Sequence, residues 1–375
     1  MADTSLASSF TTARAEPVVR PGAFGEFVLV GGATLFALPL SWFARRWFGL
    51  DAAELAVGFT AFYGAHLIND PHFAVTYLLF YRDVRRRAFG DAFAPAQRLR
   101  YLLAGFAAPL LLLAWCGLAI AAGSPSRLGQ LMEAMFFLVG WHYVKQGFGM
   151  LNVVSARRGV RYSAGERRVL LAHCFSAWAF GWAQPSLSAI DVEEKGVVYR
   201  ALPHPALLEG LAGAVLVASS LALAVTLFRK WRREGRLSLY PLTAFLVTIW
   251  LWTIFTSVDP LLVYVIPALH SVQYLYFVWL LRRNQASAAE VEFGPPVRER
   301  LLLLAVGALA LGALQFHLLP DLLDSVRLLI PKHAPLDLGA TPWFAALFAF
   351  VNIHHYLMDA VIWRRENPET SYLYH

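Results

Sequence analysis

The chain has 375 residues, of which 58% are hydrophobic and only 15% are charged. Soluble domains carry about 25% charged residues, so this composition excludes an ordinary soluble protein. The formal net charge is +7. The arginines form short clusters between apolar runs, a pattern typical of membrane topology that excludes nucleic acid as a partner. Two cysteines, each inside an apolar run, provide neither a disulfide framework nor a CxxC metal site.

Continuous apolar runs of about twenty residues predict an all-α, polytopic integral membrane helical bundle. We expect about ten transmembrane helices, of which the fifth, at residues 169–184, is short for a bilayer at about 1.5 Å of rise per residue. Their expected bounds are 22–43, 52–81, 101–122, 128–154, 169–184, 205–228, 239–258, 261–281, 301–319 and 342–363. The second run is overlong, and Pro71 predicts either a kink in it or two half-spans.

The domain organisation follows from the same pattern. We expect residues 1–20 to be a disordered tail, 21–365 a single transmembrane domain and 366–375 a C-terminal tail. Alternate connectors are rich in arginine, as in 82–87 and 229–236, and the positive-inside rule places them in the cytoplasm. Both termini are then cytoplasmic, in a bacterial-type inner membrane, although Arg45 and Arg46 depart from the rule.

Six of the eleven histidines lie inside predicted spans, where an ionisable side chain costs about 2 kcal/mol or more. They are His66 and His72 on the second span, His142 on the fourth, His270 on the eighth, and His354 and His355 on the tenth. The rise per residue places His142, His270 and His354 roughly 15–20 Å deep. Four helices can therefore present imidazoles at one level. The other histidines, His317 among them, are interpreted as hydrogen-bonded residues at span ends or in loops.

A polar residue follows most of these histidines by one helical turn: Asp70 after His66, Lys145 after His142, Gln273 after His270 and Asp359 after His355. Imidazoles and carboxylates from several helices are ligands that suit a transition metal. We therefore predict a metal site with His66, His72, His142, His270, His354 and His355 as ligands. Asp70, Lys145 and Asp359 are the predicted catalytic residues.

Two of these assignments stay open in the sequence. A kink at Pro71 could bring His72 to the same site as His66, or His72 could point elsewhere near the inner interface. Lys145 needs an anionic partner, for which Asp70 and Asp359 are the candidates. An ion pair and a proton-handling role both fit a lysine in this position.

The adjacent pair His354-His355 resembles the histidine boxes of integral membrane desaturases and hydroxylases. Boxes in that class follow HxxxH and HxxHH patterns, whereas no histidine stands two or three residues before this pair. His66 and His72 have five residues between them, and His142 and His270 stand alone. The resemblance covers these few residues and implies an oxygen-using iron centre.

The preferred hypothesis is a membrane metalloenzyme that uses one or two irons to hydroxylate, desaturate or cleave a lipid-soluble substrate. Its expected partners are the lipid bilayer, a hydrophobic small molecule or lipid as substrate, and an electron-donor protein. A zinc-dependent intramembrane hydrolase would use the same ligands. A proton- or cation-coupled transporter would use the same His/Asp/Lys cluster, with Pro71 and Pro267 interrupting helices. A haem held between His142 and His270 is a further alternative.

Overall fold

The computed structural model describes residues 22–183, 191–254, 261–290 and 296–374. Within these ranges nearly every element is a helix, so the all-α prediction is confirmed in class. The predicted tail 1–20 lies outside the described residues. Residues 368–374 of the predicted C-terminal tail form a short 3₁₀ helix (Pro368–Tyr374), with Leu373 buried against the bundle.

The α-helices of the first half are α1 (Ala23–Phe27), α2 (Thr34–Phe48), α3 (Leu50–Ala65), α4 (Asn69–Tyr81), α5 (Val84–Phe89), α6 (Pro95–Leu102), α7 (Ala108–Ala121), α8 (Pro125–Arg157) and α9 (Ala164–Ala183). Those of the second half are α10 (Ala206–Glu234), α11 (Leu239–Ile249), α12 (Leu262–Glu290), α13 (Val297–Ala313), α14 (Leu319–Ser325) and α15 (Pro342–Ile362). Short π-helical turns cover Val28–Gly32, Leu103–Ala107, Trp250–Ile254 and Leu314–Leu318. Strands β1 (Asp191–Glu194) and β2 (Val197–Arg200) pair as an antiparallel hairpin.

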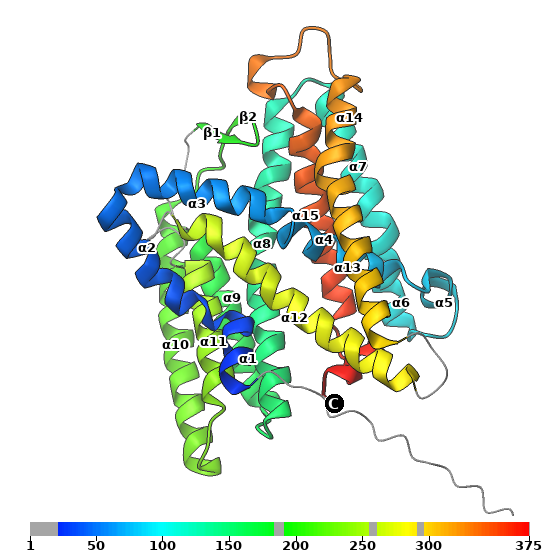
Figure 1. Ribbon diagram of the computed structural model, residues 1–375. Helices are drawn as coiled ribbons and strands as arrows, with labels where there is room; N and C mark the ends of the chain where they lie inside the picture. The colour runs from blue at the N-terminus through cyan, green and yellow to red at the C-terminus, as the bar shows by residue number, and fades with distance from the viewer. Residues whose placement is uncertain (1–21, 184–190, 255–260, 291–295, 375) are drawn as a thin grey trace, which may run out of the picture.

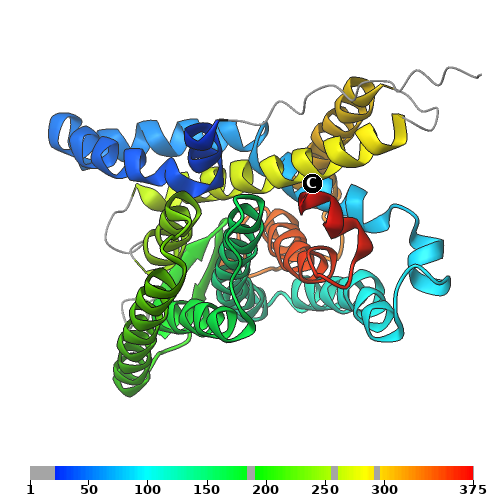
Figure 2. The same cartoon turned by 90° about the horizontal axis from the view of Figure 1, so that it is seen from below.

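The long helices α7, α8, α10, α13 and α15 run in roughly the same direction, whereas α3 and α12 cross the bundle obliquely (Figure 1). Seen from below, α12 lies along one side of the bundle with α2 and α3 beside it (Figure 2). Both α2 and α3 contact α12. The obliquely crossing α12 can therefore reach the same depth of the bundle as the upright helices α8 and α15.

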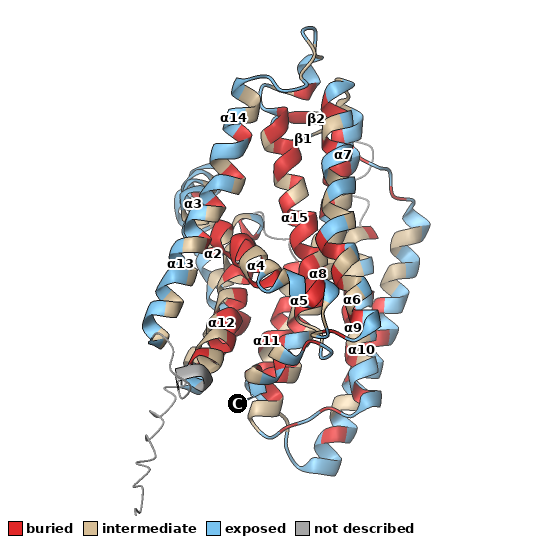
Figure 3. Ribbon diagram, turned by 90° about the vertical axis from the view of Figure 1, so that its right-hand side faces the viewer, coloured by how far each residue is buried: buried red, intermediate tan, exposed pale blue. Residues whose placement is uncertain are grey.

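Helix α15 forms the centre of the bundle, and most of its residues are buried (Figure 3). Its first backbone N–H groups, on Trp343 and Phe344, donate to the Asp324 carboxylate at 2.9 and 3.0 Å, which satisfies donors that a helix start leaves unpaired. Ala345 and Ala349 have no exposed surface, and small side chains let the neighbouring helices approach closely. The histidines of α15 are therefore held in the interior.

Within the part of the chain that the structure describes, five helical segments are long and apolar enough to cross a membrane. They are Pro95–Ala121, Ala206–Glu234, Leu262–Ser287, Val297–Ser325 and Pro342–Ile362, and the bent pair Ala23–Gly32 and Thr34–Phe48 would make six. Leucines such as Leu207 and Leu303 are largely exposed on the outside of the bundle. Apolar side chains on the outside of long helices indicate a membrane protein.

The expected number of about ten spans is not confirmed for the described residues, and the cytoplasmic side of the termini stays a prediction. The differences have physical causes. The predicted span 52–81 is two helices. Residues 255–258 of the predicted span 239–258 lie outside the described residues, and Leu239–Ile254 is apolar. Lys145 and Gln146 interrupt the apolar character of α8, as Arg167 and Arg168 do in α9.

The break between α3 and α4 falls at residues 66–68, before the proline that predicted it. Pro71 instead occupies the first turn of α4, where a residue without an N–H group is tolerated. The break changes the direction of the chain between His66 and His72. The two histidines consequently belong to different helices and lie in different surroundings.

Candidate metal centre

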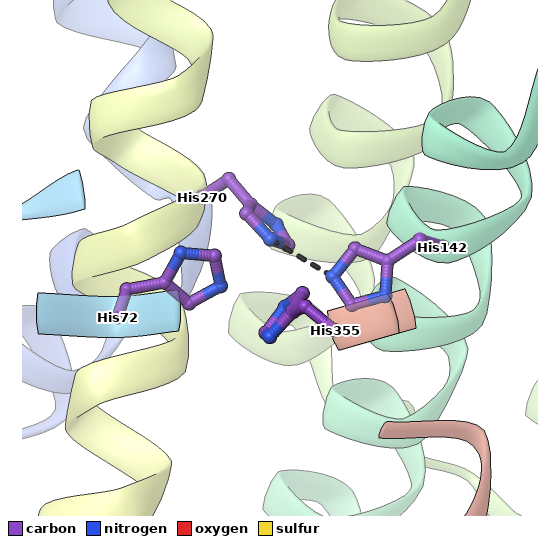
Figure 4. A group of neighbouring side chains, drawn as sticks. All are labelled: His72, His142, His270 and His355. Carbon is purple, nitrogen blue, oxygen red and sulfur yellow. Dashed lines mark hydrogen bonds between the residues drawn. The ribbon is translucent and has the colours of Figure 1, made fainter. Parts of the chain in front are cut away.

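Four imidazoles from four helices meet inside the bundle. They belong to His72 on α4, His142 on α8, His270 on α12 and His355 on α15 (Figure 4). One nitrogen from each lies within 4.8 Å of the others, and no ring is more than 4% exposed. The Nε2 atoms of His142 and His270 are 3.1 Å apart. We call this group the four-His centre. It confirms the prediction that imidazoles from four helices come together where they could hold a transition metal.

The local sequence explains how α12 and α8 reach this centre. Pro267 lies one turn before His270 on α12, and its carbonyl oxygen accepts a bond from the Ser271 hydroxyl at 2.8 Å. On α8, a Cβ atom at Gly147 would stand 3.0 Å from Thr248 of α11. A Cβ atom there would press on the Thr248 side chain, so the glycine permits the close approach of α8 to α11.

His72 is oriented by a hydrogen bond on its far side. Its Nδ1 atom lies 3.1 Å from the Ser271 hydroxyl, which is also 2.9 Å from the side-chain oxygen of Asn69. Such a contact fixes the ring and the tautomer of a metal-binding histidine. The other nitrogen of His72, Nε2, is left to face the centre.

Asp359 forms the edge of the centre, one turn after His355 as the sequence predicts. Its Oδ2 atom is 3.5 Å from His355 Nε2 and 3.8 Å from His142 Nε2. Its Oδ1 atom accepts a hydrogen bond from Tyr274 at 2.8 Å, and the Tyr274 hydroxyl is 2.6 Å from that of Thr76. The carboxylate is therefore held from α12 and α4 while one oxygen faces the imidazoles.

Several nitrogens of the centre have no hydrogen-bond partner among the described residues: Nε2 of His72, Nδ1 of His270, and both ring nitrogens of His355. A buried polar group left unpaired costs about 1–3 kcal/mol, so a set of them requires an explanation. Two nitrogens bound to one ion at about 2.0–2.1 Å stand about 2.9–3.4 Å apart at tetrahedral or octahedral angles. The 3.1 Å between His142 and His270 fits that range.

His66 and Asp70, which the sequence assigns to the same site, lie in a second group with His317. The Asp70 Oδ2 atom is 3.3 Å from His66 Nδ1 and 2.9 Å from His317 Nε2. The sequence alone predicts that His317 is a hydrogen-bonded residue near a span end. No spacing pattern connects it to Asp70, because the two are distant in sequence and meet only through the packing of α13 on α4.

His354 points away from the four-His centre. Its Nε2 atom is 3.1 Å from the carbonyl oxygen of Ala104, and its Nδ1 atom is 3.0 Å from the Tyr77 hydroxyl. Adjacent residues of a helix differ by about 100° in direction, so only one of His354 and His355 can face a given point. In the structure, His355 is the one that faces the four-His centre.

Lys145 does not form the ion pair predicted with Asp70 or Asp359. Asp70 contacts His66 and His317, and Asp359 contacts Tyr274 and the centre. The Lys145 ammonium instead lies 6.0 Å from the centre of the Phe148 ring. It sits on the same helix as His142, but the described structure provides no carboxylate within 4.0 Å of it.

The sequence matches no known protein-family model, and comparisons with curated proteins and with solved structures find no match.

Proposed function

We propose that this chain is an integral membrane metalloenzyme whose four-His centre holds a transition-metal ion, preferably iron. The reaction we infer is oxidation of a lipid-soluble substrate by hydroxylation, desaturation or cleavage. One observation carries the proposal: four buried imidazoles from four helices approach one point, where His72 Nε2 and both nitrogens of His355 have no hydrogen-bond partner among the described residues and the Nε2 atoms of His142 and His270 have only each other as hydrogen-bond partner. Imidazole nitrogens are ligands for iron, copper and zinc.

The chain's own residues would serve such a reaction in two ways. Iron supplies one-electron and dioxygen chemistry when it is bound. Because Tyr274 holds Oδ1 of Asp359, the Oδ2 atom beside His355 and His142 is the atom placed to hold a proton next to the centre. The burial of all four rings excludes bulk water, which favours a fixed centre over an aqueous ion path.

A haem between His142 and His270 fits the site poorly. Two axial nitrogens on one haem iron stand about 4 Å apart, with the porphyrin plane between them. Here the nitrogens are 3.1 Å apart, and the rings of His72 and His355 occupy the space beside them, at 5.0 Å from His270 and 4.9 Å from His142 respectively. A non-haem ion fits this arrangement better.

The proposed electron donor is a protein with an acidic surface. A cavity of about 330 Å³ is lined by Arg82, Arg282 and Arg300, together with Glu369 and Tyr372. A concentration of guanidinium groups attracts carboxylate-rich partners. In a bacterial-type inner membrane, which we propose as the location, the positive-inside rule would place this surface in the cytoplasm.

A proton- or cation-coupled transporter is the second candidate, favoured by the interruption of α3 and α4 beside Asp70. Broken helices at membrane depth are a feature of transporter sites. Reconstituted protein that moves protons or metal ions across a liposome membrane, without enzymatic turnover, would select this function.

The first test is elemental analysis and a visible spectrum of the protein purified in detergent. We expect the His142→Ala/His270→Ala variant to lose one equivalent of iron relative to the wild type. His173→Ala is the matched control, because His173 is also buried but its Nδ1 atom pairs with Ser219 at 3.1 Å, outside the centre. Zinc in place of iron would indicate the hydrolase. Equal metal content in the folded wild type and double variant would refute the metal centre.

A further inference from the structure

The group formed by His66, Asp70 and His317 is separate from the four-His centre. Asp70 and His72 are two residues apart on α4, so their side chains leave the helix about 200° apart. Asp70 Oδ2 is the common point of the group, at 3.3 Å from His66 Nδ1 and 2.9 Å from His317 Nε2. The three ligand atoms lie within 4.8 Å of one another. Two imidazoles and one carboxylate thus face one point on the opposite side of α4.

Three local features bring these residues together. The break after α3 leaves His66 at the end of one helix and Asp70 in the first turn of the next. His317 lies in the π-helical turn Leu314–Leu318, and such turns are frequent at functional sites. Gly312 lets α13 approach α4, because a Cβ atom there would stand 2.9 Å from the backbone carbon of Asp70. A larger residue at position 312 would therefore separate His317 from Asp70.

The group differs from the four-His centre in exposure. The side chains of His66 and His317 are 38% and 34% exposed, whereas that of Asp70 is 7% exposed. Around it, Phe62 and Leu67 present large exposed apolar surfaces. The carboxylate is thus withdrawn from the surface while the two imidazoles remain open toward an apolar environment.

We propose that His66, Asp70 and His317 form a second site for a divalent transition-metal ion. Two histidines and one carboxylate are the ligand set of facial iron(II) sites, which keep coordination positions open. The exposed edge of the group is where a small ligand or a lipid-soluble molecule would reach those positions. This site does not depend on the function proposed for the four-His centre.

A hydrogen-bonded network without metal is the competing explanation, because an unmetallated carboxylate could accept from both imidazoles. The two explanations differ for Asp70→Asn. The amide keeps the size of the side chain and one accepting oxygen, so a hydrogen-bonded network would tolerate it. A metal site would lose its only anionic ligand, and we expect affinity to fall by at least the roughly 10–100-fold that changes around metal ligands cause.

The test is titration of the chelator-treated, full-length protein in detergent with Co²⁺ alone, followed by its visible absorption. We expect two equivalents for the wild type and one for His317→Ala. His142→Ala/His270→Ala should also retain one equivalent, with weakened binding when Asp70→Asn is added to it. His333→Ala, which changes an exposed loop histidine outside both groups, is the control and should bind as the wild type does. Circular dichroism and gel filtration establish that each variant is folded.

The outcomes separate the two sites. Unchanged stoichiometry and affinity in both His317→Ala and Asp70→Asn would overturn the second site. So would a folded His142→Ala/His270→Ala variant that binds no Co²⁺. A single equivalent that disappears in His317→Ala but persists in His142→Ala/His270→Ala would support the second site while refuting the four-His centre.

Discussion

The two histidine groups on either side of α4 show how the same residue types can be placed in different surroundings. In the four-His centre every ring is buried, and only His72 among the four is fixed from behind by a side-chain hydroxyl. In the His66/Asp70/His317 group one buried carboxylate contacts two half-exposed imidazoles. The first arrangement has buried nitrogens without a hydrogen-bond partner among the described residues. In the second, Asp70 Oδ2 contacts one nitrogen of each imidazole, and both rings are partly exposed. Burial, more than ligand identity, distinguishes them.

The strongest test of the difference between the two groups uses the adjacent histidines of α15. We expect His355→Ala to abolish metal binding at the four-His centre. The stabilisation that metal gives, about 2.7 kcal/mol at a free concentration 100 times Kd, should vanish with it. The measurement is thermal unfolding with and without a chelator. A chelator-sensitive transition in His355→Ala equal to that of the wild type would contradict the assignment.

His354→Ala is the matched variant. It should keep the metal, because His354 faces Ala104 and Tyr77 and not the centre. The metal-free protein should instead lose about 1–3 kcal/mol, since the buried partners of the ring are left unpaired. Elemental analysis and thermal unfolding of the two variants side by side check this crossed pattern.

Asp359→Asn tests the carboxylate at the edge of the centre. The amide oxygen can still accept from Tyr274, so the fold should be retained. Loss of the charge facing His142 and His355 should weaken metal binding roughly 10–100-fold. The dissociation constant measured by competition with a chelator gives the answer. Asp324→Asn, at the start of α15, should leave this constant unchanged.

Tyr274→Phe should have a smaller effect in the same direction. It removes the hydroxyl that orients Asp359 and contacts Thr76, but leaves the carboxylate in place. We expect a decrease in metal affinity of about tenfold, at the lower end of the range for residues that orient ligands. An affinity equal to that of the wild type would mean that Asp359 needs no support from α12.

Lys145→Met should change least. The ammonium of Lys145 lies over Phe148 and pairs with neither Asp70 nor Asp359. Metal content should match the wild type, and the free energy of unfolding should change by less than about 0.5 kcal/mol. A loss of activity with unchanged metal content would return Lys145 to the site as a catalytic residue.

Much of the four-His centre could be predicted from the sequence. The depth of His142 and His270 in their helices and the one-turn spacing of His355 and Asp359 depend only on helical geometry. The choice between His66 and His72 could not be predicted, because it depends on a helix break that precedes Pro71. The choice between His354 and His355 depends on which face of α15 meets α8.

Local sequence patterns could predict neither the contact between His317 and Asp70 nor the number of spans. His317 meets Asp70 through the packing of α13 on α4, and no sequence spacing records that contact. The predicted span 52–81 is divided into α3 and α4, and α3 crosses the bundle obliquely (Figure 1). The all-α class and the membrane character depend on composition and on the continuous apolar runs, and these expectations agree with the structure.

The position of α4 has a mechanical consequence. Asp70 and His72 leave this helix in nearly opposite directions, so a rotation of α4 about its own axis moves their side chains in opposite senses. An ion that fixes Asp70 against His317 would restrict the same rotation that sets His72 against Ser271 and the centre. If both proposed sites hold an ion, occupancy on one side would then bias affinity on the other, and thermodynamic reciprocity would make the influence equal in both directions. The 13-residue helix α4 would thereby link metal binding at one site to metal binding at the other.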